Sequence, residues 1–207
     1  MRIHLFEFED LPWFPAVLRN AMTAYLAASW KMLPVGVAWA PLLQRALAAS
    51  PVPRVIDLCS GSGGPLPEVL AALNQPPLAV VRTDLYPSST DILAVDARHV
   101  FEATRRHPVA LLLTVIVPLL VLVLTPRVRP VRPLALLFTY LIPILPLLIA
   151  WDGFVSHLRT YSVDELKSFT AELSAPGYAW EAGELSLPGA PFRLPYVIGL
   201  PVSPAMP

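Results

Sequence analysis

Two uncharged apolar stretches in the middle of the chain constrain its folding more than any other feature. Residues 108–125 (PVALLLTVIVPLLVLVLT) and 133–151 (PLALLFTYLIPILPLLIAW) contain no charged side chain. As a helix, each would be about 27 Å long, close to the hydrocarbon thickness of a bilayer. The link between them carries three arginines: Arg127, Arg129 and Arg132. The pattern predicts an apolar helical hairpin over 108–151.

This hairpin has three candidate environments: lipid, the core of the protein against the sheet, and the surface of a partner. We expect lipid, because the chain is 55% hydrophobic and only 14% charged, well below the charged fraction of soluble domains. A spanning hairpin whose ends are cytosolic would place the three arginines outside, against the positive-inside tendency. A re-entrant or interfacial hairpin, with the arginines reaching headgroups on the cytoplasmic face, removes that conflict. Spanning and interfacial arrangements both stay open. Pro118, Pro143 and Pro146 interrupt the helices, which membrane helices tolerate when the freed carbonyls find other partners.

Charge and composition argue against several classes of function. The chain has 15 basic and 15 acidic residues and no long basic face, so we expect no nucleic-acid partner. Cys59 is the single cysteine, which excludes an intrachain disulfide and a thiolate metal cluster. The histidines lack the i,i+4 spacing of a zinc site: His4, His99, His107 and His157. Glu7, Glu9 and Asp10 occupy the place of a signal peptide's apolar core, so no secretory targeting is expected.

The first half of the chain has the pattern of an α/β protein. Residues 11–49 indicate two or three helices. The segment RVIDLC then has strand composition, and LPEVLAALN returns to a helical pattern. Two further short β-branched runs end at Asp84 and Asp96. This order predicts a parallel sheet, whose ligands lie beyond the carboxyl ends of the strands.

The last part of the chain predicts a helix followed by a β-hairpin. SVDE, residues 162–165, matches a capping box and begins a helix that runs to about Leu173. YAWEAGELSL and FRLPYVIGL, separated by PGAP, have the pattern of two paired strands. We therefore expect one domain over 1–207, with N-terminal helices (1–50), a βαβ core (51–104), the apolar hairpin (108–151) and a C-terminal unit (160–207).

The loop at 57–64 (DLCSGSGG) is the strongest candidate for a ligand site. A glycine-rich turn between a strand and a helix lets the backbone approach a ligand, and an acid at the end of the next strand can accept both hydroxyls of a ribose. The spacing from Asp57 to Asp84 fits one βαβ unit. The alternative is a plain turn with strand-end aspartates as solvated caps. We favour the ligand loop because three matching elements occur in order.

These residues resemble the class I S-adenosylmethionine-dependent methyltransferases. VIDLCSGSGG is similar to their first motif, VVRTDLYP to the acidic end of their second strand, and AVDAR to the adenine-side motif after the third. The whole chain resembles a bacterial subgroup with an EFEDLPWFP start, a long apolar insertion and a TYS..EL helix. Cys59 departs from the pattern, because it replaces the first glycine of the loop. We interpret it as a small buried residue in preference to a nucleophile.

The resemblance implies S-adenosylmethionine as cofactor and a set of residues to bind it. Four would line its methionine and ribose side: Asp57, Ser60, Gly61 and Gly63. Four more would bind the remainder of the cofactor. Asp84 would hold the ribose hydroxyls, Leu85 would pack against the adenine, and Asp96 and Ala97 would meet the adenine amino edge.

One region of the resembled family has no counterpart here. The third strand runs directly into HVFEATRR, which resembles the family's fifth strand, so the fourth strand and its helices are missing. The stretch between Asp84 and Asp96 is also too short for the usual helix. We therefore expect a reduced Rossmann-like, mostly parallel sheet. His99 and Glu102 are the nearest ionisable groups to a missing base, and each fits a strand edge or cap better, so the catalytic residues are unknown.

The sequence supports three functional hypotheses. The first is a membrane-associated methyltransferase at the cytoplasmic face, with a small-molecule or lipophilic acceptor. The second is a catalytically inactive remnant that binds cofactor or a partner. The third is a structural membrane hairpin protein whose α/β part has no ligand. Whether the chain is an enzyme, and its oligomeric state, stay open at this point.

Overall fold

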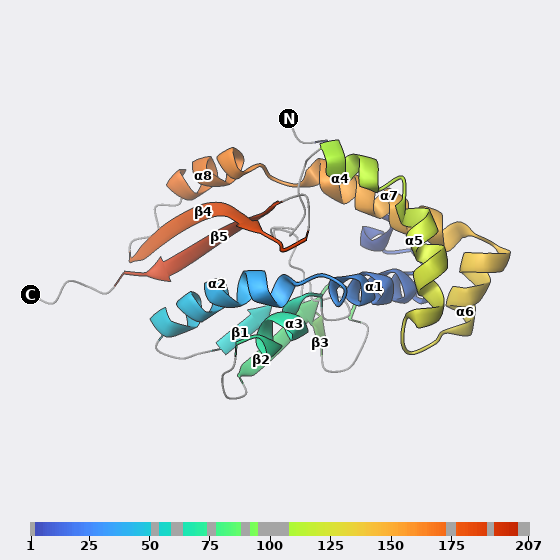
Figure 1. Cartoon of the computed structure of the whole chain (residues 1–207), viewed down its shortest axis with the longest axis horizontal. Coiled ribbons are helices and arrows are strands. Elements are labelled where there is room, and N and C mark those ends of the chain that lie inside the picture. Colours follow the sequence, from blue (N-terminus) through green and yellow to red (C-terminus); the bar gives the residue numbers. More distant parts are fainter. Residues whose placement is uncertain are drawn as a thin grey trace, which may run out of the picture.

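The C-terminal β-hairpin and the apolar helices lie at opposite ends of the molecule (Figure 1). Two helices from the N-terminal region run along the molecule between these ends. The structure is a computed structural model. It describes residues 3–50, 54–58, 64–73, 78–87, 92–94, 108–172, 177–189 and 193–202. These residues form a mixed α/β fold with a small parallel sheet and a separate antiparallel β-hairpin.

The N-terminal region forms two helices, as the sequence predicts. A short 3₁₀ turn, η1 (Phe8–Asp10), precedes α1 (Ala16–Trp30) and α2 (Val35–Ala49). The two helices bend by 88° at the break between them. Pro15 and Pro34 directly precede α1 and α2, where a residue without a backbone N–H removes no intrahelical hydrogen bond.

The βαβ core is also confirmed. It consists of β1 (Arg54–Asp57), α3 (Leu66–Ala71), β2 (Ala79–Asp84) and β3 (Ile92–Ala94). The strands are parallel in the order β1-β2-β3, and Asp57 pairs with Arg82 while Asp84 pairs with Ala94.

Helices α2 and α3 cover one face of this sheet. Ala40, Leu47, Val69 and Leu73 form a buried cluster there, against which Val55 of β1 packs. The alternation of the strands turns Ile56 and Val81 to the opposite face, where they are 65% and 43% exposed.

Both apolar stretches are helical but interrupted, as their prolines indicate. The first is divided into α4 (Pro108–Leu113), α5 (Val117–Leu124) and the 3₁₀ turn η2 (Thr125–Arg127). The second is divided into α6 (Pro133–Leu136), the π-helical turn η3 (Leu137–Leu141) and α7 (Ile144–Arg159). The prolines explain two of the breaks, because proline has no N–H to continue a preceding helix. Helix α5 begins at Val117, directly before Pro118, and α7 begins directly after Pro143.

The pieces nevertheless pack together and against α1. The buried hydroxyls of Thr125 and Thr139 lie 3.4 Å apart across the hairpin. Leu145 of α7 joins a buried cluster with Phe14, Leu18 and Met22. The hairpin therefore has a protein-facing side as well as an exposed one.

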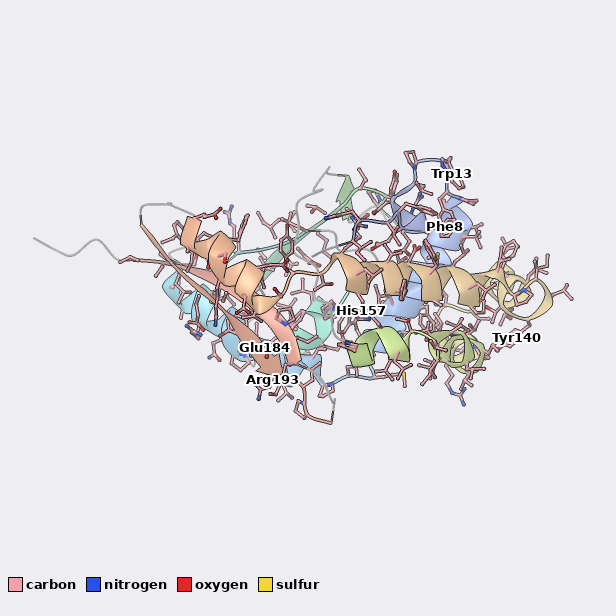
Figure 2. The ribbon with its side chains drawn as sticks, turned by 90° about the horizontal axis from the view of Figure 1, so that it is seen from above. Phe8, Trp13, Tyr140, His157, Glu184 and Arg193 are labelled. Carbon is pink, nitrogen blue, oxygen red and sulfur yellow. The ribbon has the colours of Figure 1, made fainter. Side chains whose placement is uncertain are left out.

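The C-terminal unit follows the predicted pattern closely. In α8 (Val163–Glu172), the capping box is formed: the Glu165 amide donates to the Ser162 hydroxyl (3.3 Å) and the Ser162 amide donates to the Glu165 carboxylate (2.8 Å). Strands β4 (Tyr178–Ser186) and β5 (Arg193–Pro201) pair antiparallel along their whole length. Figure 2 shows Glu184 and Arg193 of this hairpin far from Tyr140 of η3, which lies at the apolar end.

Candidate functional site

Asp57 and Asp84 end two adjacent parallel strands at the same edge of the sheet. Val55 packs against α2 and α3, and side chains two residues apart on a strand share a face, so the side chain of Asp57 lies on this covered face. Asp57 pairs with Arg82, and Asp84 follows Arg82 by two residues, so its side chain lies on the same face. The Thr83 hydroxyl donates to the Asp57 carbonyl oxygen (3.2 Å), which ties the two strand ends together. The sequence thus predicted correctly that both acids end strands at one edge.

A cavity of about 370 Å³ opens beside Asp57. Its described lining comes from α2, the start of α3, α8 with the residues just before it, and β5. The lining residues besides Asp57 are Trp39, Leu42, Leu43, Pro65, Leu66, Val69, Tyr161, Leu166, Pro195, Tyr196 and Val197. Asp57 is the single carboxylate among these described residues, and the rest of the surface is apolar or aromatic. Asp84 is not among them.

The β5 wall of the cavity is held in place by a polar network outside it. The Tyr196 hydroxyl donates to Glu181 Oε1 (2.5 Å), and Arg45 Nη2 lies 2.7 Å from Glu181 Oε2. The hydrogen bond from Arg45 lowers the pKa of Glu181, and the hydrogen bond to Glu181 raises the pKa of Tyr196. A Cβ at Gly183 would lie 2.8 Å from the Tyr196 ring. These contacts position the phenol at the wall of the cavity.

The end of β2 contacts the N-terminal segment instead of the cavity. The Tyr86 amide donates to Asp84 Oδ1 (2.8 Å), which closes a turn after the strand. The Arg19 guanidinium lies over the Tyr86 ring, with its Cζ atom 3.8 Å from the ring centroid. Arg19, which is buried in α1, donates to the carbonyl oxygens of Glu9 (3.0 Å) and Leu11 (2.7 Å). Segment 7–11 is therefore held beside the acidic end of β2.

Glu9 is a buried carboxyl group that sequence reasoning did not single out. Its Oε1 atom has no hydrogen-bond partner among the described residues. Burial, followed by the charges of Asp152, Asp10 and Asp84, raises the pKa of Glu9 to about 8, although Arg19 opposes this. The clustering of acids in EFED is the sequence signal that was available, and it was used only against a signal peptide.

Asp152 of α7 anchors this segment. Its two carboxylate oxygens accept the amides of Phe8 (2.9 Å) and Glu9 (3.0 Å), across more than 140 residues of sequence. Burial raises the pKa of Asp152, and the two backbone hydrogen bonds lower it. The first turn of η1 thus depends on one buried acid from the opposite half of the chain.

Some of the predicted cofactor residues lie within the described part of the chain, and the others lie outside it. Asp57 lines the cavity, Asp84 ends β2, and Leu85 follows it as a half-buried residue. Gly64, at the end of the loop, has a left-handed backbone conformation (φ 51°), which glycine adopts without strain. The remaining predicted residues lie outside the part of the chain that the structure describes: Ser60, Gly61, Gly63, Asp96 and Ala97. Cys59, His99 and Glu102 lie outside it as well.

A second candidate site is a broad apolar surface on the hairpin. Its side chains, from α4, α5 and neighbouring turns and from the start of α7, are 45% to 76% exposed. We call them the apolar surface: Leu112, Val115, Ile116, Leu119, Leu120, Val123, Leu141 and Leu147. Arg127 and Arg129 are exposed in the link between the two halves of the hairpin.

Among the described residues, none of the helices alone has the length and apolar composition needed to cross a bilayer. Two bent pairs have them together: α1 with α2, and Pro133–Leu141 with α7, the latter bent by 89°. Length and composition alone do not distinguish a broken span from a re-entrant loop.

Comparisons with known proteins give no further assignment: no family model, no curated protein and no solved structure matches the chain. Within the described residues, no group of three or more histidines, cysteines and acids could hold a metal ion. The chemistry available at the cavity is therefore that of one carboxylate, two phenols and an apolar wall next to a glycine-rich loop.

Proposed function

We propose that the chain is a membrane-associated, S-adenosylmethionine-dependent methyltransferase with a lipophilic acceptor. In this proposal, β1, β2 and β3 are the remaining half of a reduced Rossmann-like sheet. The strand–loop–helix–strand order and the parallel pairing of β1, β2 and β3 support this assignment. Ligands of such sheets bind outside the carboxyl ends of the strands.

The observation that carries the proposal is the cavity beside Asp57. It opens at the carboxyl end of β1, and Pro65 and Leu66, directly after the glycine-rich loop, form part of its wall. A volume of about 370 Å³ lies within the range of small-molecule sites. The Asp57 carboxylate complements the positive charges of the cofactor's ammonium and sulfonium groups. These features fit the cationic end of the cofactor that the resemblance implies, whereas Asp84, the proposed ribose ligand, is not among the described lining residues.

The described residues would have distinct roles. Asp57 would hold the cationic end of the cofactor, the loop ending at Gly64 would let the backbone approach it, and Asp84 would accept the ribose hydroxyls. When bound, S-adenosylmethionine supplies a methyl group activated by the sulfonium. Transfer then needs chiefly proximity and in-line geometry, which the cavity wall would provide.

Binding of methyl-labelled S-adenosylmethionine, measured by equilibrium dialysis, tests this proposal. Asp84→Ala should weaken binding at least tenfold, because a carboxylate bound to two hydroxyls contributes at least one charge-assisted hydrogen bond. Asp164→Ala, an exposed acid on α8, is the matched control and should bind like the wild type. Equal binding by wild type and Asp84→Ala, or none by either, would contradict the proposal.

The apolar surface supports attachment to the cytoplasmic face of a membrane. Exposed aliphatic side chains on several short helices, with Arg127 and Arg129 in the link between the two halves of the hairpin, are typical of an interfacial segment whose cations reach anionic headgroups. The breaks at residues 114–116 and 142–143 favour a hairpin that lies in the interface over one that spans it.

Vesicle co-sedimentation with and without anionic phospholipid tests this attachment. Val115→Asp should reduce binding several-fold, because it places a charge within the apolar surface, where Val115 is 72% exposed. Val202→Asp, after β5, is the matched control, since Val202 is 54% exposed and lies outside both bent helix pairs. If both variants sediment like the wild type, the apolar surface is not the membrane contact.

One observation favours the second candidate, a protein that binds the cofactor without transferring a methyl group. Only residues 85–91 join β2 to the parallel strand β3, fewer than an ordinary crossover needs, so the sheet departs from that of an active family member. Formation of S-adenosylhomocysteine in the presence of membrane extract distinguishes the two. Product formation that depends on Asp84 excludes the inactive candidate.

A further inference from the structure

The turn that follows β2 is held by a side chain from outside the sheet. The Tyr86 amide donates to Asp84 Oδ1 (2.8 Å), which fixes the carboxylate relative to the turn. The Tyr86 ring lies against α1, where the Cζ atom of Arg19 is 3.8 Å from the ring centroid. The direction of the Asp84 carboxylate therefore depends on a contact between the turn and α1.

Arg19 is a buried cation, 7% exposed, and its guanidinium orders the groups around it. Its Nε and Nη2 atoms donate to the carbonyl oxygens of Glu9 (3.0 Å) and Leu11 (2.7 Å), while the same group lies over the Tyr86 ring. A planar, forked guanidinium can make these three contacts at once, and the compact ammonium of a lysine cannot. Because a buried charge adds little net stability, this arrangement favours a positioning role.

The segment that Arg19 contacts is itself fixed from its far side. Asp152 of α7 accepts two backbone amides of segment 7–11 (2.9 Å and 3.0 Å), so the segment is tied to the other half of the chain. The Tyr86 hydroxyl donates to the Asp10 carbonyl oxygen (3.4 Å), which links the segment to the turn a second time. These contacts join segment 7–11, Arg19 and Tyr86 into one unit next to the end of β2.

From these contacts, we infer that Arg19 is a positioning residue of the proposed cofactor site and acts through Tyr86 on the carboxylate of Asp84. The inference rests on the proposed function, in which Asp84 accepts the ribose hydroxyls. It adds to that function a side chain from α1 and the segment 7–11, neither of which belongs to the βαβ core. Arg19 acts without touching the cofactor, because it fixes the direction in which the carboxylate meets the ribose.

Selectivity for a ribose hydroxyl isolates this role, and isothermal titration calorimetry on the full chain measures it. Wild type should bind S-adenosylhomocysteine at least about fivefold more tightly than its 2′-deoxy analogue, which lacks one hydroxyl for Asp84. Arg19→Lys keeps the charge without the planar fork, and Tyr86→Leu removes the ring but keeps the backbone amide. Both should lower this ratio of affinities to less than about twofold. Tyr86→Phe retains the ring and should keep the ratio of wild type.

Two comparisons separate positioning from a general loss of stability. Thr139→Val removes a hydroxyl from the buried pair in the hairpin, so it should lower the urea midpoint and leave the ratio unchanged. If Arg19 acts through Tyr86, the double variant Arg19→Lys with Tyr86→Leu should lose no more affinity for S-adenosylhomocysteine than Tyr86→Leu alone. Independent roles would instead multiply the two losses.

Each result decides the inference. A ratio that Arg19→Lys and Tyr86→Leu both retain, losses that multiply in the double variant, or an equal fall of the ratio in Thr139→Val would overturn it and leave the proposed function intact. A wild-type ratio near one would also overturn it. If Arg19→Lys does not fold, the ratio in Tyr86→Leu decides against that in Tyr86→Phe. Absence of binding of both ligands by wild type would refute the proposed function and this inference with it.

Discussion

The buried carboxyl group of Glu9 makes a specific prediction about stability and pH. The folded chain holds the pKa of this group at about 8, against 4.5 for the ordinary value. Because the folded state binds the proton more tightly than the unfolded chain, this group's contribution to stability is fully present below pH 4.5 and is lost as the pH rises towards 8. Above that, Glu9 is an anion among Asp152, Asp10 and Asp84, with Arg19 as the opposing charge.

The magnitude follows from the two pKa values. A difference of 8 − 4.5 = 3.5 pH units, at about 1.36 kcal/mol per unit, corresponds to on the order of 4–5 kcal/mol. Partial solvent access to the side chain reduces this figure, so we expect about 2–5 kcal/mol. Glu9→Gln resembles the protonated acid at every pH. The free energy of unfolding of Glu9→Gln should be close to that of wild type at pH 5. At pH 9 it should exceed that of wild type by about 2–5 kcal/mol.

Urea denaturation followed by circular dichroism, in one mild detergent at five pH values from 5 to 9, measures this difference. Glu172→Gln, an exposed position on α8, is the control and should show no such rise. The pH dependence of the free energy of unfolding that remains in Glu9→Gln includes the contribution of Asp152, whose pKa is also raised by burial. A flat difference between Glu9→Gln and wild type across this range would refute the reasoning, since Glu9 would then titrate as in the unfolded chain.

The other predictions concern contacts that the structure places at defined points, and each is checked by the urea midpoint. Asp152→Ala should reduce the free energy of unfolding by about 2–4 kcal/mol, because two backbone amides lose a charged acceptor; an unchanged midpoint would contradict the anchoring role of Asp152. Ser162→Ala should cost about 0.5–2 kcal/mol by removing the cap of α8. Gly36→Ala should destabilise by about 1–3 kcal/mol, because its Cβ would meet the Glu68 carbonyl oxygen. Gly153→Ala on α7 has open space and should stabilise by up to about 1 kcal/mol, so equal effects of the two glycine substitutions would contradict this packing.

Local signals in the sequence were sufficient for most elements of the fold. The capping box at Ser162 and Glu165 predicts the start of α8, and PGAP between two segments with a strand pattern predicts the C-terminal hairpin. Both depend on residues that are neighbours in the chain. Pro118 and Pro143 indicate where the apolar hairpin is interrupted, but composition alone does not show how α5 and η3 pack against α7. The buried Thr125–Thr139 contact depends on that packing.

The candidate site was predictable only in part, for a related reason. Asp57 and Asp84 end strands, so strand patterns locate them at one edge of the sheet. The cavity wall, in contrast, is supplied by Tyr196 and Leu166, more than a hundred residues further along the chain. The contact between Glu9 and Asp152 likewise joins residues 143 positions apart. Without tertiary structure, no periodicity or spacing connects such distant residues.

Ultraviolet cross-linking of labelled S-adenosylmethionine, followed by tryptic mapping, tests the location of the cofactor most directly. Cleavage after Arg54, Arg82 and Arg98 separates peptide 55–82, with the glycine-rich loop, from peptide 83–98, with Asp84. We expect the label in these two peptides and its loss on addition of excess unlabelled S-adenosylhomocysteine. Label confined to peptides outside 55–98, or label that unlabelled compound does not displace, would contradict a nucleoside site between Asp57 and Asp84.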